Sequence, residues 1–186
     1  EQLVGSTRRE ILRSVVQSWL PWADVHEVTL ASEPGAWQLS LRADVRAKRF
    51  AEPIDREGTN LAIPGLTALP GSTLVARYGA QGARETALTL DDPVLYHVRR
   101  RIELPAGVTV LQSPGATLVD RPLLVAKRTT AVADDELVDD LRLDLSAGSI
   151  APEDYAEFFA DMRTVDEGFL HAISVTAPGA TTAGAD

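Results

Sequence analysis

One long run of the sequence, residues 37–48, alternates between apolar and polar residues. Successive side chains of a β-strand point to opposite faces of a sheet, so this period of two predicts a strand with one buried and one solvated face. A weaker strand pattern covers residues 24–31, and Pro34 and Gly35 lie between the two runs. Because proline and glycine favour turns, we predict an antiparallel hairpin. The apolar members of the longer run are Trp37, Leu39, Leu41, Ala43, Val45 and Ala47.

Residues 7–20 place their apolar members at helical spacing. Thr7 and Glu10 have the form of a capping box, in which each side chain satisfies a backbone N–H group at the start of a helix. Pro21 ends the run. We therefore predict an amphipathic helix that packs one apolar stripe against a sheet. The stripe contains Ile11, Leu12, Val15, Val16, Trp19 and Leu20.

Short strand patterns fill most of the remaining sequence, and a second helical pattern follows them. Pro152 suits the first position of a helix, and a wide apolar stripe continues from there to Ile173. The predicted strands cover residues 73–78, 85–90, 94–104, 109–111 and 116–119, followed by a hairpin of residues 123–132 and 137–145. This order predicts an α+β fold that is mostly β, with antiparallel sheets or β-sandwich-like lobes and an N-terminal and a C-terminal amphipathic helix.

The strand pattern is interrupted at Asp92 and Pro93, which predicts a boundary between two lobes. We expect a first lobe over residues 1–91, containing the N-terminal helix, and a second lobe over residues 92–174, containing the closing helix. Residues 175–186 are rich in alanine, glycine and threonine, and we expect them to form a disordered tail.

Residues 51–73 follow neither the helical nor the strand period, because prolines and glycines interrupt every short apolar run. A connection of this length inside a compact domain is often functional or mobile. Its apolar residues Leu61, Ile63 and Leu66, together with Trp22 near the N-terminal helix, are therefore our candidate contact surface for a partner.

The composition excludes several classes of site. The sequence has no cysteine, so it cannot form a disulfide, a thiolate metal site or a cysteine nucleophile. The formal net charge is −9, and residues 134–167 alone hold 12 acidic residues and two arginines. Acidic surfaces repel phosphate backbones, so we expect no nucleic-acid partner. We interpret this acidity as solvation, with a face for a basic partner as the alternative. No run reaches the roughly 20 apolar residues of a membrane span, so we expect no membrane insertion.

The motifs of common active sites are missing as well. His26, His97 and His171 lie far apart and form no helical metal-binding pair. The sequence contains no Gly-x-Ser-x-Gly elbow and no glycine-rich phosphate loop. The acidic residues 134–140 lack the alternation of a calcium loop, and we interpret them as a solvated hairpin tip. We expect no metal and no cofactor. A pair of carboxylates needs no motif, so a hydrolase of that kind is left open.

Arg100 is a charged residue on the apolar side of the predicted strand 94–104. Asp139 takes the same kind of position on the second arm of the later hairpin, beside Leu137 and Leu141. Buried charges need a partner of opposite sign, so we predict that Arg100 pairs with Asp139 and that the pair is structural. Tyr155 and Phe158 are the aromatic residues that we expect to anchor the closing helix in the core.

Two stretches resemble a known family. Residues 96–107, Tyr-His-Val-Arg-Arg-Arg-Ile-Glu-Leu-Pro-Ala-Gly, resemble a strand and turn near the end of bacterial transglutaminase-like proteins that carry an N-terminal domain of unknown function. Residues 150–155, Ile-Ala-Pro-Glu-Asp-Tyr, resemble the start of the closing helix of the same β-rich C-terminal region. The aromatic residues Phe158 and Phe159 and the pair Val165-Asp166 continue that likeness. The order of the elements is similar from about Gly5 to Ile173.

The resemblance implies a region downstream of the transglutaminase-like core. The Cys-His-Asp site of that family lies in the core, and none of it carries over because this chain has no cysteine. Proteins of the family are typically exported, which implies a periplasmic or cell-surface setting, although a cytoplasmic one is left open. The leading hypothesis is a non-catalytic accessory domain that contacts the upstream domain or a protein partner. The alternatives are an independent β-sandwich module that binds peptide or glycan, and the carboxylate-pair hydrolase.

Overall fold

The computed structural model describes residues 2–21, 23–32, 39–46, 51–79, 82–114 and 117–177. The chain divides into two compact units, Glu1–Phe50 and Ala51–Asp186. Every strand pair in the described residues is antiparallel, and one helix lies near each end of the chain. The predicted α+β fold with mostly β structure is therefore confirmed.

The first unit contains helix α1 (Gln2–Trp19) and the hairpin of strands β1 (Asp24–Ser32) and β2 (Leu39–Arg46). Helix α1 packs on β1, and Val16 and Val28 are buried between them. The helix begins earlier than the predicted capping box, and the hairpin is present as expected. The flanks of the predicted 37–48 strand, with Trp37, lie outside the described residues.

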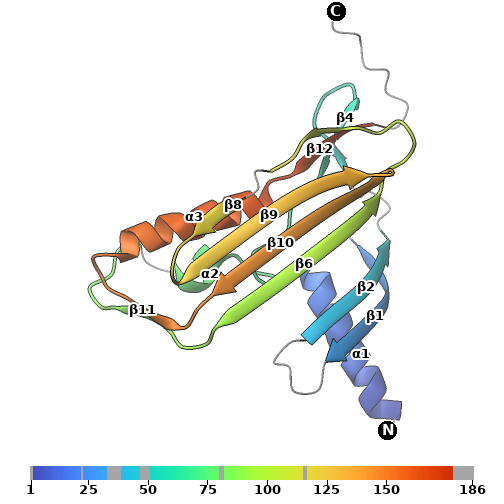
Figure 1. Cartoon of the computed structure of the whole chain (residues 1–186). Coiled ribbons are helices and arrows are strands. Elements are labelled where there is room, and N and C mark those ends of the chain that lie inside the picture. Colours follow the sequence, from blue (N-terminus) through green and yellow to red (C-terminus); the bar gives the residue numbers. More distant parts are fainter. Residues whose placement is uncertain are drawn as a thin grey trace, which may run out of the picture. The chain divides into compact units, whose positions relative to one another are not determined.

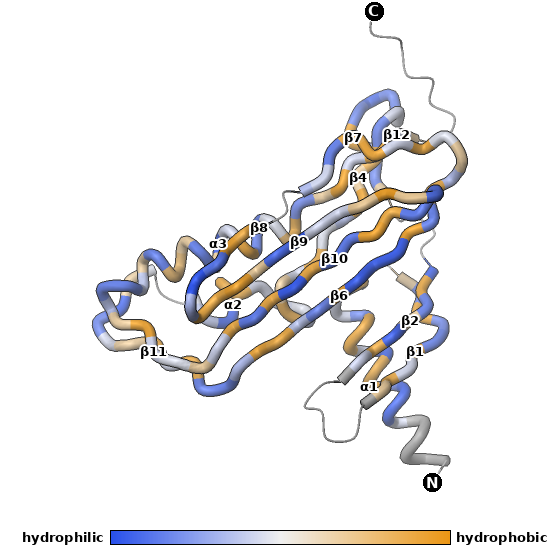
Figure 2. Tube along the Cα trace, in the orientation of Figure 1, coloured by the Kyte–Doolittle hydropathy of each residue, from blue (hydrophilic) through white to orange (hydrophobic). Residues whose placement is uncertain are grey.

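The second unit is built on a four-stranded sheet with the strand order β6-β10-β9-β8 (Figure 1). The strands are β6 (Val94–Glu103), β8 (Thr117–Asp120), β9 (Leu124–Ala133) and β10 (Glu136–Leu145). The hairpin of β9 and β10 turns at Asp134 and Asp135, whose φ angles are 50° and 63°. Two consecutive positive φ angles are typical of a tight hairpin turn, and aspartate is among the residues that tolerate them. Hydrophobic and hydrophilic residues alternate along β10 (Figure 2).

Helix α3 (Tyr155–Leu170) covers one face of this sheet near β8 and β9. It buries the stripe Tyr155, Phe158, Met162, Val165 and Phe169. The short helix α2 (Leu74–Tyr78) packs beside α3. Two smaller sheets complete the unit. One pairs β5 (Leu88–Leu90) with β11 (Gly148–Ile150), and the other has the order β3 (Glu52–Pro53), β4 (Asn60–Ile63), β12 (Ile173–Thr176) and β7 (Val110–Gln112).

The strand predicted over residues 73–78 is wrong, because these residues form α2. The Thr73 side chain caps the helix by accepting a hydrogen bond of 3.1 Å from the amide of Ala76. A second cap comes from Asp166, a residue of α3 that is distant in sequence. Five residues are too few to form a stable helix alone, so this tertiary contact decides the conformation.

Two expectations about the ends of elements are also corrected. The closing helix ends at Leu170, and Ile173 belongs to β12 rather than to the helical stripe. The predicted tail begins too early, because Val175 and Thr176 are buried in β12; residues 178–186 lie outside the described residues. The boundary expected at residues 91 and 92 falls inside the second unit, where β5 before it pairs with β11 after it.

Candidate functional site

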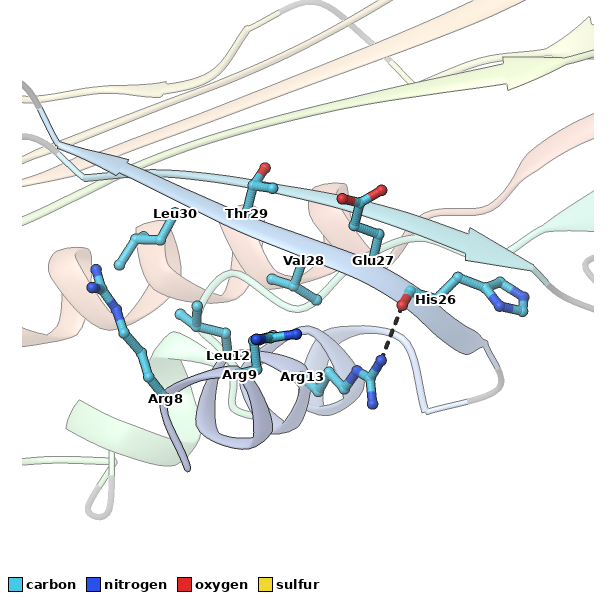
Figure 3. A pocket seen from close by; sticks show the side chains of 9 residues that line it. All are labelled: Arg8, Arg9, Leu12, Arg13, His26, Glu27, Val28, Thr29 and Leu30. Carbon is cyan, nitrogen blue, oxygen red and sulfur yellow. Dashed lines mark hydrogen bonds between the residues drawn. The ribbon is translucent and has the colours of Figure 1, made fainter. Parts of the chain in front are cut away.

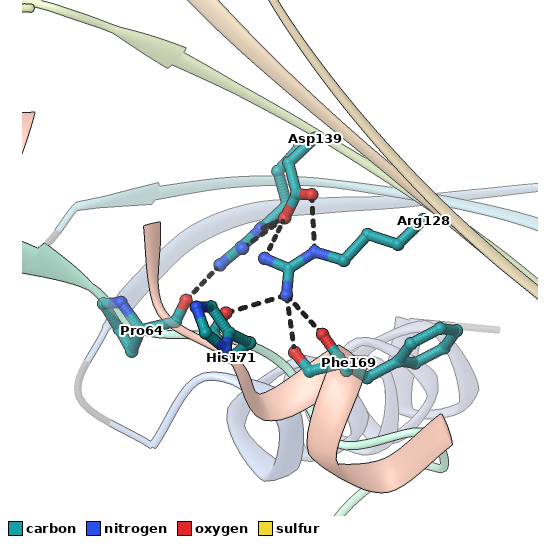
Figure 4. A network of polar contacts seen from close by, with 7 residues as sticks. Pro64, Arg128, Asp139, Phe169 and His171 are labelled. Atoms are coloured by element: carbon teal, nitrogen blue, oxygen red, sulfur yellow. Dashed lines mark hydrogen bonds and ion pairs between the residues drawn. The ribbon is translucent and has the colours of Figure 1, made fainter. Parts of the chain in front are cut away.

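Arg128 and Asp139, the two charged residues with no exposed surface in the described part of the second unit, form a cluster with Arg100 (Figure 4), which we call the arginine–aspartate cluster. Strand register places Arg100 of β6 directly opposite Asp139 of β10. Arg128 of β9 lies diagonally from Asp139, which pairs with Thr130. The side chains of Arg128 and Asp139 are 0% exposed, and that of Arg100 is 10% exposed.

Both carboxylate oxygens of Asp139 accept hydrogen bonds from the arginines. Arg128 donates from Nε to Oδ1 at 2.9 Å and from Nη2 to Oδ2 at 3.1 Å. Arg100 donates from Nε to Oδ2 at 3.0 Å, and its Nη2 forms a second, shorter bond to the same oxygen. Such charge-assisted bonds are stronger than those between neutral groups. The pairing of Arg100 with Asp139 that the sequence predicted is present in the structure.

The remaining donors of the cluster bind backbone carbonyls (Figure 4). Arg128 Nη1 donates to the carbonyl oxygens of Gly168, Phe169 and His171 at 2.8, 3.1 and 2.7 Å. Arg100 Nη1 donates to the carbonyl oxygen of Pro64 at 2.7 Å. The last carbonyls of a helix lack intrahelical partners and carry partial negative charge. The cluster therefore fastens the C-terminal end of α3 to the middle of the sheet.

Two guanidinium groups share one carboxylate in this cluster. Burial lowers the pKa of Arg100, and the nearby charge of Arg128 lowers it further, whereas Asp139 opposes both effects. Both oxygens of Asp139 accept hydrogen bonds from guanidinium groups and its side chain is 0% exposed, so a substrate proton cannot reach this carboxylate without disrupting the cluster. Its geometry supports a structural role.

Sequence reasoning missed Arg128, although the signal was present. Arg128 occurs in the same alternation as the buried residues Leu124 and Ala126 of β9, just as Arg100 and Asp139 do on their own strands. Three charged residues at apolar-face positions of neighbouring strands could therefore have been grouped into one cluster.

Asp166 of α3 is the other buried carboxylate in the described residues, and the sequence analysis gave it no role. Its Oδ1 and Oδ2 accept the backbone N–H groups of Leu74 and Val75 at 2.8 and 2.9 Å. Burial raises the pKa of Asp166, and these hydrogen bonds act in the opposite direction. Both oxygens thus serve as an N-terminal cap for α2, as expected for a carboxylate at a helix start.

Tyr155 and Phe158 lie in the core, as predicted for the anchor of the closing helix, at 1% and 8% exposure. The Tyr155 hydroxyl donates to the carbonyl oxygen of Tyr78 in α2 at 3.3 Å. The guanidinium of Arg84 lies 5.5 Å from the centroid of the Tyr155 ring, within the range of a cation–π contact. Both aromatic residues are thus engaged in packing.

The candidate contact surface of residues 61–66 is corrected by the structure. Ile63 and Leu66 are only 2% and 3% exposed, because β4 pairs with β12 and the Leu66 amide donates to the Phe169 carbonyl. Leu61 is half-buried, and Trp22 lies outside the described residues. Gly65 of this connection marks a tight backbone contact with the end of α3, because a Cβ there would lie 2.3 Å from the Phe169 carbonyl oxygen.

A groove of about 420 Å³ lies between α1 and β1 in the first unit (Figure 3). Arg8, Arg9 and Arg13 form its rim, and Val28 is buried in its floor. Arg13 also donates to the carbonyl oxygen of His26 at 3.0 Å. The groove combines positive charge with an apolar floor.

A second concave region, of about 450 Å³, lies on the face of the main sheet opposite the arginine–aspartate cluster. His97 Nε2 and Asp140 Oδ2 are 2.9 Å apart there, and Arg142 lies 3.4 Å from the other oxygen of Asp140. Burial raises the pKa of Asp140, but the hydrogen bonds and charges of His97 and Arg142 outweigh it, so the pKa is lowered. The region is lined by Arg99, Lys127, Thr129, Ala131, Val138, Asp140 and Arg142.

Within the part of the chain that the structure describes, no group of three or more histidines and carboxylates could hold a metal ion. No helix of the described residues is long and apolar enough to cross a membrane.

No protein-family model matches the sequence, and no curated protein matches it. Among solved structures, a "putative protease" from Parabacteroides distasonis ATCC 8503 is similar at a TM-score of 0.46 and 11% sequence identity. The match covers 52% of this chain and 19% of that chain. At this level of similarity the comparison assigns no activity to the chain.

Proposed function

We propose that the chain is a non-catalytic accessory domain of a larger, exported, transglutaminase-like bacterial protein, where it contacts the upstream domain or a protein partner. The observation that carries this proposal is the use of the buried carboxylates. Asp139 and Asp166, the buried carboxylates of the described residues, have all four oxygens engaged with guanidinium or backbone donors of the same chain. General acid–base catalysis requires a carboxyl group within reach of a substrate proton.

The residues that carry the family resemblance also support a framework role. Residues 96–107 include most of β6 and the turn after it, and residues 150–155 lead into α3. Arg100 belongs to the first stretch, and the helix that begins at the end of the second is held at its other end by Arg128. The likeness thus falls on the elements that the arginine–aspartate cluster joins.

The proposal is tested with the purified chain and with the product of the complete gene. Both are assayed for amide hydrolysis and for amine incorporation into casein, with and without iodoacetamide. We expect no activity from the chain and a thiol-dependent activity, blocked by iodoacetamide, from the complete product.

Binding is measured in parallel, by calorimetry between the chain and the remainder of the gene product expressed separately. A measurable affinity supports the accessory role. Activity of the chain alone that disappears when one carboxylate is replaced contradicts it, and so does a complete gene product without any further domain.

A further inference from the structure

We propose that the free edge of β6 binds an extended acidic peptide, which adds to the main sheet as a further strand. The feature behind this inference is a long edge strand whose exposed residues Arg99 and Arg101 form no salt bridge within the described residues. The inference stands whether the chain is an accessory domain or works alone, because it uses only residues of the second unit.

Within the described residues of the second unit, strand β6 forms one edge of its sheet and pairs only with β10, in the order β6-β10-β9-β8. It is ten residues long, and its register with β10 is unbroken from Val94 to Glu103. An edge strand presents unpaired backbone N–H and C=O groups, which are a template for another strand. Proteins that recognise extended peptides use such edges, since main-chain hydrogen bonds provide affinity and alternate side chains provide specificity.

Two arginines lie near the middle of the solvent-facing side of β6. Arg99 and Arg101 are exposed and share this side with His97, whereas the largely buried Arg100 lies on the opposite side. Among the described residues, no carboxylate forms a salt bridge with Arg99 or Arg101. Asp140, which faces Arg99 across the strands, is engaged with His97 and Arg142 instead.

Positive charge extends from β6 onto the neighbouring strands. Register places Arg142 of β10 directly opposite Lys127 of β9, so two cationic residues lie side by side. Like charges in directly opposite positions destabilise a sheet. Arg142 reaches Asp140, but Lys127 has no salt bridge in the described residues. Arg99, Arg101, Arg142 and Lys127 thus lie on one face of the sheet.

The charges beside the β6 edge also favour one kind of ligand over others. A second copy of β6 pairing antiparallel about Arg99 would bring the two copies of Arg99 against each other, which disfavours self-association. Nucleic acid is disfavoured as well, because its evenly spaced phosphates would also meet Glu103, Glu136 and Asp144, which flank Arg99 and Arg101 on the same side. A short peptide with carboxylates at alternate positions avoids both problems, since residues two apart on a strand face the same side. Its two carboxylates would lie beside Arg99 and Arg101.

The probe is the fluorescein-labelled peptide Ser-Thr-Val-Glu-Val-Glu-Val-Thr-Ser, titrated with the full 186-residue chain and followed by fluorescence anisotropy. Two control peptides separate the contribution of charge from that of main-chain hydrogen bonds. One carries Gln in place of both Glu residues, and the other has N-methyl groups on alternate amides, which block strand pairing. The protein variants are Arg99→Thr/Arg101→Thr and the matched control Arg163→Thr, which removes an exposed arginine from α3. Circular dichroism melting verifies that each variant is folded.

We expect saturable binding of the acidic peptide that weakens about tenfold in the double variant and is unchanged in Arg163→Thr. The Gln peptide should bind about tenfold more weakly to the wild-type chain, and the N-methylated peptide should not bind. Equal binding of the Gln peptide overturns the charge argument, and equal binding of the N-methylated peptide overturns strand addition. A wild-type dimer in sedimentation that excludes the peptide would overturn the proposal in favour of a second copy at this edge.

Discussion

Replacing Asp139 by asparagine tests whether the arginine–aspartate cluster holds the second unit together. The substitution keeps the size of the side chain but removes the only negative charge between Arg100 and Arg128. The two guanidinium groups would remain in the interior without a counter-ion. The NH2 group of the asparagine would also point its N–H bonds at the N–H groups of an arginine. Removing one partner of a buried ion pair costs about 3–5 kcal/mol. A domain is stable by only about 5–15 kcal/mol, so Asp139→Asn should lose a large part of that free energy.

Urea titration at neutral pH measures this loss. Far-UV circular dichroism follows both units, whereas tryptophan fluorescence follows the first unit alone, because Trp19, Trp22 and Trp37 all belong to it. For a domain with an m-value in the middle of the usual range, a loss of this size lowers the urea midpoint by about 2 M. The main circular dichroism transition should therefore move to lower urea while the tryptophan transition stays in place.

Asp144→Asn is the matched control, since Asp144 is an exposed carboxylate on the same strand. We expect its midpoint to equal that of the wild type. If Asp139→Asn also unfolds at the wild-type midpoint, the reasoning about the buried charges is refuted.

A triple variant separates the charges of the cluster from its hydrogen bonds. Arg100→Met, Arg128→Met and Asp139→Leu together remove every charge of the cluster, a replacement that is often neutral or stabilising by about 1–4 kcal/mol. Here the same change also removes the arginine donors of the Pro64, Gly168 and His171 carbonyls, whereas the Phe169 carbonyl keeps its bond from the Leu66 amide. An unsatisfied buried acceptor costs about 1–3 kcal/mol, so the triple variant should recover only part of the stability lost in Asp139→Asn.

Three further changes test other parts of the structure. Gly65→Ala should destabilise the second unit in urea titrations, because a Cβ at this position would lie 2.3 Å from the Phe169 carbonyl oxygen; a midpoint equal to that of the wild type would contradict the tight contact. Asp166→Ala leaves two backbone N–H groups of α2 without their acceptor, so it should lower the free energy of unfolding in urea by about 1–3 kcal/mol and allow earlier proteolysis near α2. Asp166→Asn should lower the free energy less, because its amide oxygen can still accept one of these bonds. The lowered pKa of Asp140 predicts a stability contribution that is complete well above pH 3.8 and is lost as the pH falls through the lower, folded-state pKa. Melting temperatures should therefore differ between the wild type and Asp140→Asn at pH 6 and converge in strong acid, and a constant difference would rule out this pairing with His97.

Local patterns predicted the long elements of the fold well. The hairpin of β9 and β10 was visible because period-two alternation on both arms meets at Asp134 and Asp135. The helix α1 and the helix α3 were visible because their apolar stripes have a period that no strand can satisfy. Burial of one face requires an apolar residue at every inward position of such a long segment. The resulting pattern can therefore be recognised from the segment's own sequence, without knowledge of the elements that pack against it.

Short elements were less predictable, because their conformation depends on distant residues. Residues 74–78 contain too few positions to distinguish a helix from a strand, and α2 forms where Asp166 supplies its cap. Strand β12 follows α3 after only two residues, and it is defined by its pairing with β4 and β7 rather than by its own pattern. The connection of residues 51–73 looked irregular for the same reason.

The sequence by itself determined the mostly antiparallel class, the two terminal helices and the pairing of Arg100 with Asp139, because strand alternation places each side chain on a known face. Only the tertiary structure decided that Arg128 completes the cluster, that the carbonyls ending α3 receive its donors, and that Ile63 and Leu66 are buried rather than exposed. It also placed β6 at the edge of its sheet, with Arg99 and Arg101 on the side facing solvent. Register and strand order arise from contacts between segments far apart in the chain, and a local period carries no information about which segments those are.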